Sequence, residues 1–183
     1  MFTNSLPHHT KIVEIRIKNI NQLFNSFDPS PFLEKDLDDD AVEYIESSFS
    51  EYHLKTKIKI IIHVPHKKKG TFNEESIKDA IRNFFVYRNM IEDNNIKSKF
   101  QEGRKSMFIG IGFLIFCLSL SEVINIYLVE NIITRIASEA LMIFGWVAMW
   151  KPISNLLYDW WPQKKQKKIY EKISKSEICF IYT

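Results

Sequence analysis

The sequence has few of the residues that build phosphate-binding loops, disulfide frameworks and metal sites. Its 183 residues include only five glycines, and none of them forms a G-x-G-x-x-G, Walker or G-x-S-x-G pattern. Its two cysteines, Cys117 and Cys179, lie far apart, so neither a disulfide framework nor a cysteine-based zinc site is indicated. No nucleophile has an evident neighbouring base. We therefore expect a non-enzymatic protein that needs no cofactor.

Strong positive charge and an N-terminal apolar run are also lacking. A formal net charge of +3 gives no overall basicity that would favour nucleic acid. The opening segment MFTNSLPHHTK contains no apolar core of a cleavable signal peptide. We expect the chain before Met107 to remain on the cytoplasmic side of a membrane.

The apolar residues that are present gather in two long runs, Met107–Val129 and Ile132–Trp150. Each run is close to the ~20 residues that a helix needs to cross ~30 Å of hydrocarbon. Only Glu130 and Asn131 clearly separate the runs. The pattern predicts a transmembrane helical hairpin, and a buried helix pair in a soluble protein is the alternative.

Lysine and arginine residues flank both apolar runs, whereas the connecting turn is nearly free of them. By the positive-inside rule, this distribution predicts that both termini are cytoplasmic. The flanking residues are Lys97, Lys99, Arg104, Lys105, Lys151, Lys164, Lys165, Lys167 and Lys168.

Three ionisable residues interrupt the apolar runs: Glu122, Arg135 and Glu139. Glu122 and Glu139 are almost equally distant from the turn, so a regular hairpin places them at similar depth. Arg135 is four residues before Glu139 and can pair with it or extend toward the interface. We interpret the three as structural groups that join the hairpin to itself or to a partner subunit. An ion or proton path is the alternative.

The flanking segments contain signals for both strands and helices. A helix from about residue 36 to 52 follows Ser30-Pro31, which fits an N-cap and first helical residue. Thr71 or Asn73 can cap a second helix that continues into the first apolar run. The predicted strands are Lys11–Ile17, Lys55–Val64 and Ser176–Tyr182.

These signals predict an α+β membrane protein of order β-α-β-α-TM-TM-α-β, in which a transmembrane hairpin is inserted in a small cytoplasmic α+β domain. The cytoplasmic domain would comprise residues 1–105 and the transmembrane hairpin residues 106–151. An interfacial amphipathic helix over 152–162 would precede a basic cytoplasmic tail, 163–183, that ends in the last strand.

An acidic segment before the first predicted helix is the main candidate surface of the cytoplasmic domain. Asp36, Asp38 and Asp40 have the spacing that opens a calcium loop, but Ala41 and Ser47 stand where glycine and glutamate are required. Carboxylates there complement the helix dipole. The alternative is a partner-docking or divalent-metal role, and the docking residues would be Asp28, Pro29, Phe32, Glu34, Asp36 and Asp38.

A tryptophan-rich stretch followed by lysines predicts the membrane–water boundary. Pro152 permits a bend from the second span into the interface plane. Aromatic residues are typical of that interface, and lysines beside it attract an anionic cytoplasmic leaflet. The predicted interface residues are Trp150, Tyr158, Trp160, Trp161, Lys164, Lys165, Lys167 and Lys168.

Three stretches carry a resemblance to known proteins: NQLFNSFDPSPFLEKDLDDDAVEYI, IRNFFVYR and FGWVAMWKPISNLLYDWWP. In this order they resemble an uncharacterised family of small bacterial inner-membrane proteins. The resemblance implies a bacterial source and a multi-pass inner-membrane protein with cytoplasmic termini. It implies no activity, ligand or catalytic residue.

We therefore expect a non-enzymatic inner-membrane protein whose cytoplasmic domain docks or scaffolds a protein partner, or self-assembles as a homo-oligomer. The first alternative is an oligomeric transport or channel component that uses Glu122, Arg135 and Glu139. The second is a membrane-bound hydrolase with a divalent metal held by Asp28, Asp36, Asp38 and His63.

Overall fold

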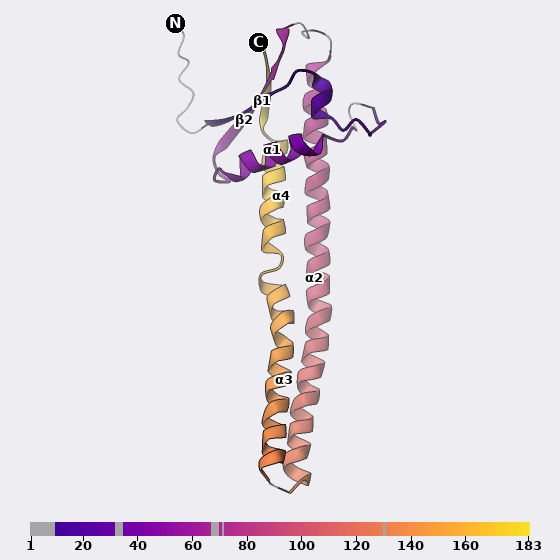
Figure 1. Cartoon of the computed structure of the whole chain (residues 1–183), viewed down its shortest axis with the longest axis vertical. Coiled ribbons are helices and arrows are strands. Elements are labelled where there is room, and N and C mark those ends of the chain that lie inside the picture. The colour runs from indigo at the N-terminus through magenta and orange to yellow at the C-terminus, as the bar shows by residue number, and fades with distance from the viewer. Residues whose placement is uncertain (1–9, 32–34, 67–69, 71, 130) are drawn as a thin grey trace. The chain divides into compact units, whose positions relative to one another are not determined.

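The computed structural model describes residues 10–31, 35–66, 70, 72–129 and 131–183. The chain forms two compact units (Figure 1). Met1–Glu92 and Lys165–Thr183 make one, which we call the α/β unit. Asp93–Lys164 makes the other, which we call the hairpin unit.

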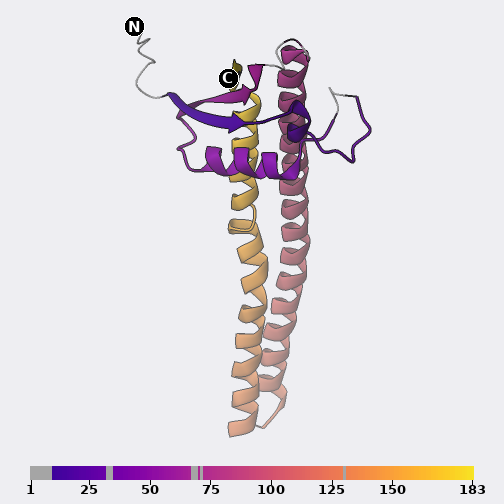
Figure 2. The same cartoon turned by 45° about the horizontal axis from the view of Figure 1, so that its top comes forward.

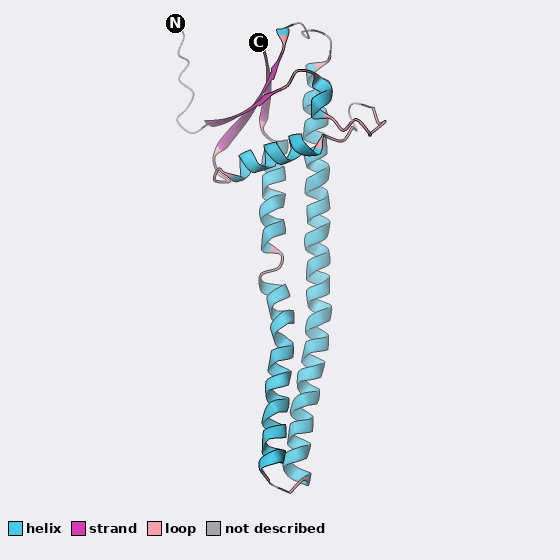
Figure 3. Ribbon diagram, in the orientation of Figure 1, coloured by secondary structure: helices cyan, strands magenta, loops and turns pink. Residues whose placement is uncertain are grey.

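The chain contains both helices and strands, as expected of a mixed fold (Figure 3). A short 3-10 helix, η1, follows the first strand. The elements are β1 (Thr10–Arg16), η1 (Ile20–Leu23), α1 (Asp39–Ser50), β2 (Lys57–Val64), α2 (Glu74–Tyr127), α3 (Ile132–Leu157), α4 (Trp161–Ser174) and β3 (Glu177–Tyr182).

The α/β unit contains a three-stranded sheet of order β1-β2-β3, and both strand pairs are parallel. Val13 pairs with Ile60, which pairs with Ile178 on the other side. Parallel neighbours need a crossover connection, usually helical. Here α1 lies between β1 and β2, and α2 to α4 lie between β2 and β3. The last strand therefore joins the first two across most of the sequence.

One face of this sheet forms the hydrophobic core of the α/β unit. On β2, Ile58, Ile60, Ile62 and Val64 alternate with more exposed residues. The same core cluster includes residues of α1, the start of α2 and the end of α4 (Figures 1 and 2). Its fully buried side chains include Phe49, Phe85 and Ile173. One sheet face and three helices thus share one core.

The opposite face of the sheet carries charged side chains. Lys59 contacts Glu177 at 2.8 Å across β2 and β3, and His63 lies 3.5 Å from Glu14 across β2 and β1. Parallel sheets are usually covered on both faces. The charged side chains on this face, which stand beside the part-exposed Ile12 and Ile181, suit it to contact with water.

The helix caps differ in part from those expected. The N-cap of α1 is Asp38, whose Oδ1 accepts a hydrogen bond from the Asp40 amide at 3.1 Å. Ser30 and Pro31 precede this cap and do not begin the helix, because the Ser30 amide donates to Asp28 Oδ1 instead. Asn73 caps α2 as predicted, by accepting from the Glu75 amide at 3.0 Å. Thr71 lies outside the described residues.

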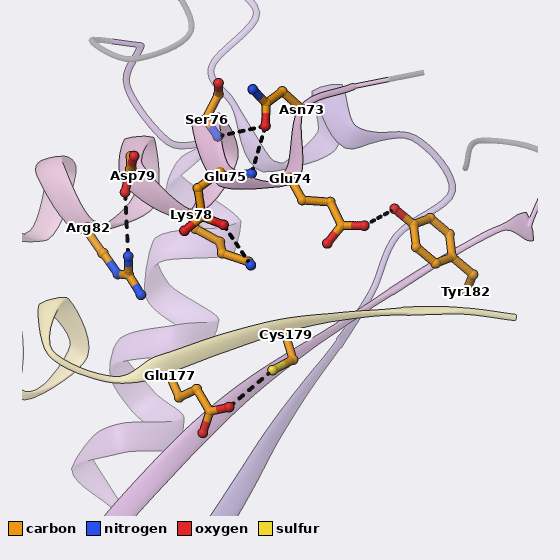
Figure 4. A network of polar contacts seen from close by, with 10 residues as sticks. All are labelled: Asn73, Glu74, Glu75, Ser76, Lys78, Asp79, Arg82, Glu177, Cys179 and Tyr182. Atoms are coloured by element: carbon orange, nitrogen blue, oxygen red, sulfur yellow. Dashed lines mark hydrogen bonds and ion pairs between the residues drawn. The ribbon is translucent and has the colours of Figure 1, made fainter. Parts of the chain in front are cut away.

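The first turn of α2 is joined to the last strand by side-chain contacts (Figure 4). The Tyr182 hydroxyl donates a hydrogen bond to the Glu74 carboxylate. This bond raises the pKa of Tyr182 to about 12, because the neighbouring carboxylate disfavours ionisation of the phenol. The contact holds the end of β3 against the helix that carries much of the core.

In the hairpin unit, α2 and α3 lie side by side (Figure 2). We call the line along which they meet the seam, and most of its buried residues are small. Six buried residues recur at every seventh position: Gly103, Gly110 and Cys117 on α2, and Ser138, Gly145 and Pro152 on α3. Ser121 and Met149 are also buried there. A Cβ added at Gly145 would lie 2.8 Å from Leu114 Cδ1, which shows how closely the helices approach. The Ser121 and Ser138 hydroxyls are 2.6 Å apart in the seam.

Large apolar side chains lie on the outside of this hairpin. Phe108 is 77% exposed, Ile133 77% and Trp150 79%. Both α2 and the α3–α4 stretch are long and apolar enough to cross a membrane, and only 17% of each apolar window is buried. A core helix of a soluble protein would be mostly buried, so this surface is unusual for a protein that meets water on all sides.

The expected separate helix over residues 152–162 is not present as such. Helix α3 continues through Pro152 to Leu157, and the interruption falls at Tyr158–Trp160, before α4 begins at Trp161. Pro152 is buried, and its Cγ lies 3.0 Å from the position of a Cβ on Gly110. The glycine makes room for the proline ring, so the helix tolerates one missing hydrogen bond without ending.

Candidate functional site

The acidic segment of the α/β unit is held in shape by Asp28. Its carboxylate accepts hydrogen bonds from the Ser30 amide at 2.9 Å and the Asp36 amide at 2.7 Å. The Ser30 side chain, followed by the Asp36 and Ser30 amides, lowers the pKa of Asp28 to about 2. Asp28 is therefore ionised at neutral pH, and its carboxylate oxygens already accept hydrogen bonds from the Ser30 and Asp36 amides.

A pocket of about 140 Å³ opens beside this segment. The acidic segment forms one side of the pocket, and helix α2 forms the other side. Its lining consists of Asn25, Asp36, Leu37, Asp39, Phe84, Tyr87, Arg88 and Ile91. Of the predicted docking residues, Asp36 belongs to this pocket, which we call the acidic pocket.

Asp36 is the one lining residue that was predicted as a docking residue, and Arg88 and Tyr87 are the polar residues that α2 adds to the pocket. The Arg88 guanidinium lies 5.2 Å from the centre of the Phe84 ring, a cation–π contact that orients it. Arg88 forms no ion pair with any residue that the structure describes. The stretch IRNFFVYR contained a signal for these residues, since Tyr87 and Arg88 follow Phe84 at helical spacing. In the structure Phe84 is buried.

The other predicted docking residues have different positions. The Asp38 carboxylate caps α1 and is engaged there. Pro29 is exposed, and Phe32 and Glu34 lie outside the described residues. The acidic pocket thus combines Asp36 and Asp39 with Arg88 and with apolar lining residues. Such a lining suits a partner segment that has a basic side chain next to an apolar one.

The residues of the hypothetical metal site do not come together. Asp28 binds backbone amides, Asp38 caps α1, and His63 lies on β2 beside Glu14. Among the residues that the structure describes, no three His, Cys, Asp or Glu side chains are grouped so as to hold a metal ion. The geometry therefore does not favour the hydrolase hypothesis.

The three ionisable residues of the apolar runs, Glu122, Arg135 and Glu139, are all exposed on the hairpin unit. Within the described part of this unit the ion pairs are Lys97–Asp93 and Lys151–Asp159. The possible pairing of Arg135 with Glu139 is therefore not formed in the single chain. The charged groups of these residues are therefore free to contact a partner or solvent.

Aromatic residues cluster where α3 ends. The rings of Trp160 and Phe100 are in tilted contact with their centres 5.5 Å apart, and Trp160 Nε1 donates to the Leu156 carbonyl at 3.1 Å. Lys164 Nζ lies 4.7 Å from the centre of the same indole ring. Tyr158 and Trp161 are in edge-to-face contact at 5.4 Å. The cluster holds indole and ammonium groups side by side, as expected of a membrane–water boundary.

The remaining predicted interface residues flank this cluster. Trp150 lies on the outer surface of α3, and Lys165, Lys167 and Lys168 are on α4 within the α/β unit. The Lys167 backbone carbonyl accepts a hydrogen bond from the Asn89 side chain at 2.8 Å. These lysines therefore follow the aromatic cluster on a helix that is anchored in the core of the α/β unit by Ile169 and Ile173.

Comparison with protein-family models, with curated proteins and with solved structures finds no match. The class of this protein is therefore defined by its fold and its surfaces. The chain combines a small parallel α/β unit with an apolar two-helix hairpin.

Proposed function

We propose that the chain is a two-span protein of a bacterial inner membrane that acts without catalysis, by binding a protein partner to its α/β unit. The observation that carries the proposal is the distribution of side chains on the hairpin unit. Small residues fill its interior, whereas Phe108, Ile133 and Trp150 lie outside. Large apolar side chains on the outside of a helix pair are unfavourable in water, but they are expected in lipid.

The orientation in the membrane is supported by charge. Lysine and arginine residues precede the first span and follow the second, so they gather at the end of the hairpin away from the turn. The Trp160–Lys164 contact lies at this same end. The positive-inside rule then places both termini in the cytoplasm. The lysines of α4 can each gain about 1 kcal/mol from an anionic leaflet.

The function of the α/β unit is supported by the acidic pocket. Asp36 and Asp39 offer two carboxylates beside Leu37, Phe84 and Ile91, and no nucleophile or metal cluster accompanies them among the described residues. We propose that this pocket receives a protein segment with a lysine or arginine next to a large apolar residue. The charge pairing would orient the segment, and burial of its apolar side chain would supply most of the affinity.

Cysteine labelling tests the two-span topology. In a chain with Cys117→Ala and Cys179→Ser, we expect Val129→Cys to react with a membrane-impermeant maleimide in intact cells. Val129 is chosen because it is 83% exposed, whereas Asn131 caps α3 and should be kept. Asn95→Cys, on the exposed surface before the first span, should react only after the membrane is opened. Labelling of Asn95→Cys alone in intact cells would reverse the orientation, and loss of the protein from washed membranes would refute insertion.

Site-specific photocrosslinking tests the acidic pocket in living cells. A photoreactive residue in place of Tyr87, which lines the pocket, should give one discrete adduct. The matched control is Asn83, an exposed residue on the same helix that does not line the pocket. The adduct should decrease at least tenfold when Asp36 and Asp39 are both changed to lysine, because the basic segment is then repelled. Equal adducts at both positions, or an adduct indifferent to these charges, would contradict the proposal.

A further inference from the structure

We propose that the hairpin unit pairs with a second copy of this chain through one polar face, so that two hairpins form a four-helix membrane bundle. The face carries Glu122 and Asn125 on α2, and Arg135 and Glu139 on α3. All four residues are exposed in the single chain. The inference rests on the proposed membrane insertion, because in water these exposed side chains would need no partner.

The seam shows that the four residues share one side of the hairpin. Taking buried Cys117 as the reference, at about 100° per residue Glu122 lies about 140° around α2 and Asn125 about 80°. Taking buried Gly145 as the reference on α3, Glu139 lies about 120° around and Arg135 about 80° in the same rotational sense. In an antiparallel pair, equal rotational sense on the two helices points to the same side.

The contacts in the seam also fix the depth of these residues. Ser121 and Ser138 are level, because their hydroxyls are 2.6 Å apart. Glu122 and Glu139 follow these serines directly and therefore lie within about 3 Å of one level. Asn125 and Arg135 lie closer to the turn, within about 1.5 Å of each other in depth. The polar face is thus a compact patch and not a scattered set.

Lipid is an unsuitable neighbour for this patch. Ionised side chains facing hydrocarbon are costly, and polar residues in spans almost always face other protein or water. No ion pair within the described hairpin involves Glu122, Arg135 or Glu139. Apolar side chains surround the patch on the same side, among them Ile111, Leu118 and Met142, all exposed. The face therefore offers a polar centre with an apolar rim.

The charges suit a second copy of the same chain. A twofold axis along the membrane normal brings α2 of one hairpin opposite α3 of the other and leaves every residue at its own depth. Arg135 then faces Asn125 of the second copy, with the second copy's Glu122 one helical turn away. Glu139 of the same copy as Arg135 lies four residues further along α3. Each guanidinium would thus meet carboxylates from both copies, and the symmetry makes this contact twice.

Charge reversal tests the pairing in lipid nanodiscs or mild detergent. We expect the full-length chain to be a dimer by native mass spectrometry. Glu122→Arg and Arg135→Glu should each raise the dissociation constant at least tenfold, because like charges then face each other twice. The double variant Glu122→Arg/Arg135→Glu should recover the dimer, since the arginine at position 122 would face carboxylates at 135 and 139 of its partner.

Val123→Arg is the matched control, because it introduces the same charge one residue away. Val123 is 48% exposed and lies on the opposite side of α2 from the polar face. This variant should remain dimeric. A monomeric wild-type chain, equal effects of Val123→Arg and Glu122→Arg, or a double variant that stays monomeric would overturn the pairing. The labelling of Val129→Cys would still stand in these cases, so failure of the pairing is distinguishable from failure of membrane insertion.

Discussion

Replacing Phe85 with alanine is expected to lower the free energy of unfolding of the α/β unit by about 3–5 kcal/mol. The Phe85 side chain is fully buried, in edge-to-face contact with Phe84 at 5.3 Å and in contact with Tyr170 of α4 at 5.9 Å. Removal of the ring leaves a cavity between elements that are far apart in the sequence. Since a whole domain is stable by only about 5–15 kcal/mol, much of the stability of the unit would be lost.

The neighbouring residue supplies the control for this prediction. Val86 is 41% exposed on the same helix, and Val86→Ala should change the stability by less than about 0.5 kcal/mol. Pulse proteolysis of the solubilised full-length chain across a urea series measures both variants. Similar midpoints for Phe85→Ala and Val86→Ala would show that Phe85 is not at the centre of the core.

Replacing Gly145 with valine is expected to destabilise the hairpin unit by about 1–3 kcal/mol. A Cβ at this position would lie 2.8 Å from Leu114 Cδ1 and 3.3 Å from Cys117 Cβ. The Leu114 side chain can move, but its Cα at 3.5 Å leaves little room for the additional methyl groups of valine. The helices must therefore separate, which also weakens the 2.6 Å contact of Ser121 with Ser138.

Gly112 is the matched control, since a Cβ there would meet nothing within 4 Å. Both glycines are inside apolar helices, so the loss of backbone freedom on substitution is similar. Titration with SDS in mixed micelles, followed by circular dichroism, reports the loss of the packed hairpin. We expect Gly145→Val to unfold at a clearly lower SDS fraction than the wild type, and Gly112→Val to unfold near the wild type. The reverse order would refute the seam.

Several elements could be predicted because their signals are local. The alternation of isoleucine and lysine in KIKIIIHV predicts a strand, and β2 spans Lys57–Val64. Asn73 before two glutamates predicts a helix start, and it caps α2. The apolar runs predict two long helices, and the structure contains them. In each case neighbouring residues alone supply the energetic preference.

Other features were wrong or missed because they depend on particular side-chain contacts that residue type and periodicity alone do not show. Ser30-Pro31 resembled a helix start, but the hydrogen bonds of Asp28 to Ser30 and Asp36 hold that stretch as a loop. Pro152 was expected to permit a bend into the interface plane, but α3 continues through it, because Gly110 on the facing helix makes room for its ring. The recurrence of Gly103, Gly110 and Cys117 at every seventh residue is a sequence signal of the seam.

By itself, the sequence determined the three strands, the start of α2, and that two helices are long and apolar enough to cross a membrane. Only the tertiary structure decided that the strands are parallel, which helix faces meet in the seam, and that Arg88 joins Asp36 and Asp39 at one pocket. The physical reason is the range of the interactions. Hydrophobic periodicity and capping act within a few residues, whereas strand pairing, close helix packing and a pocket require contacts between residues that only the fold brings together.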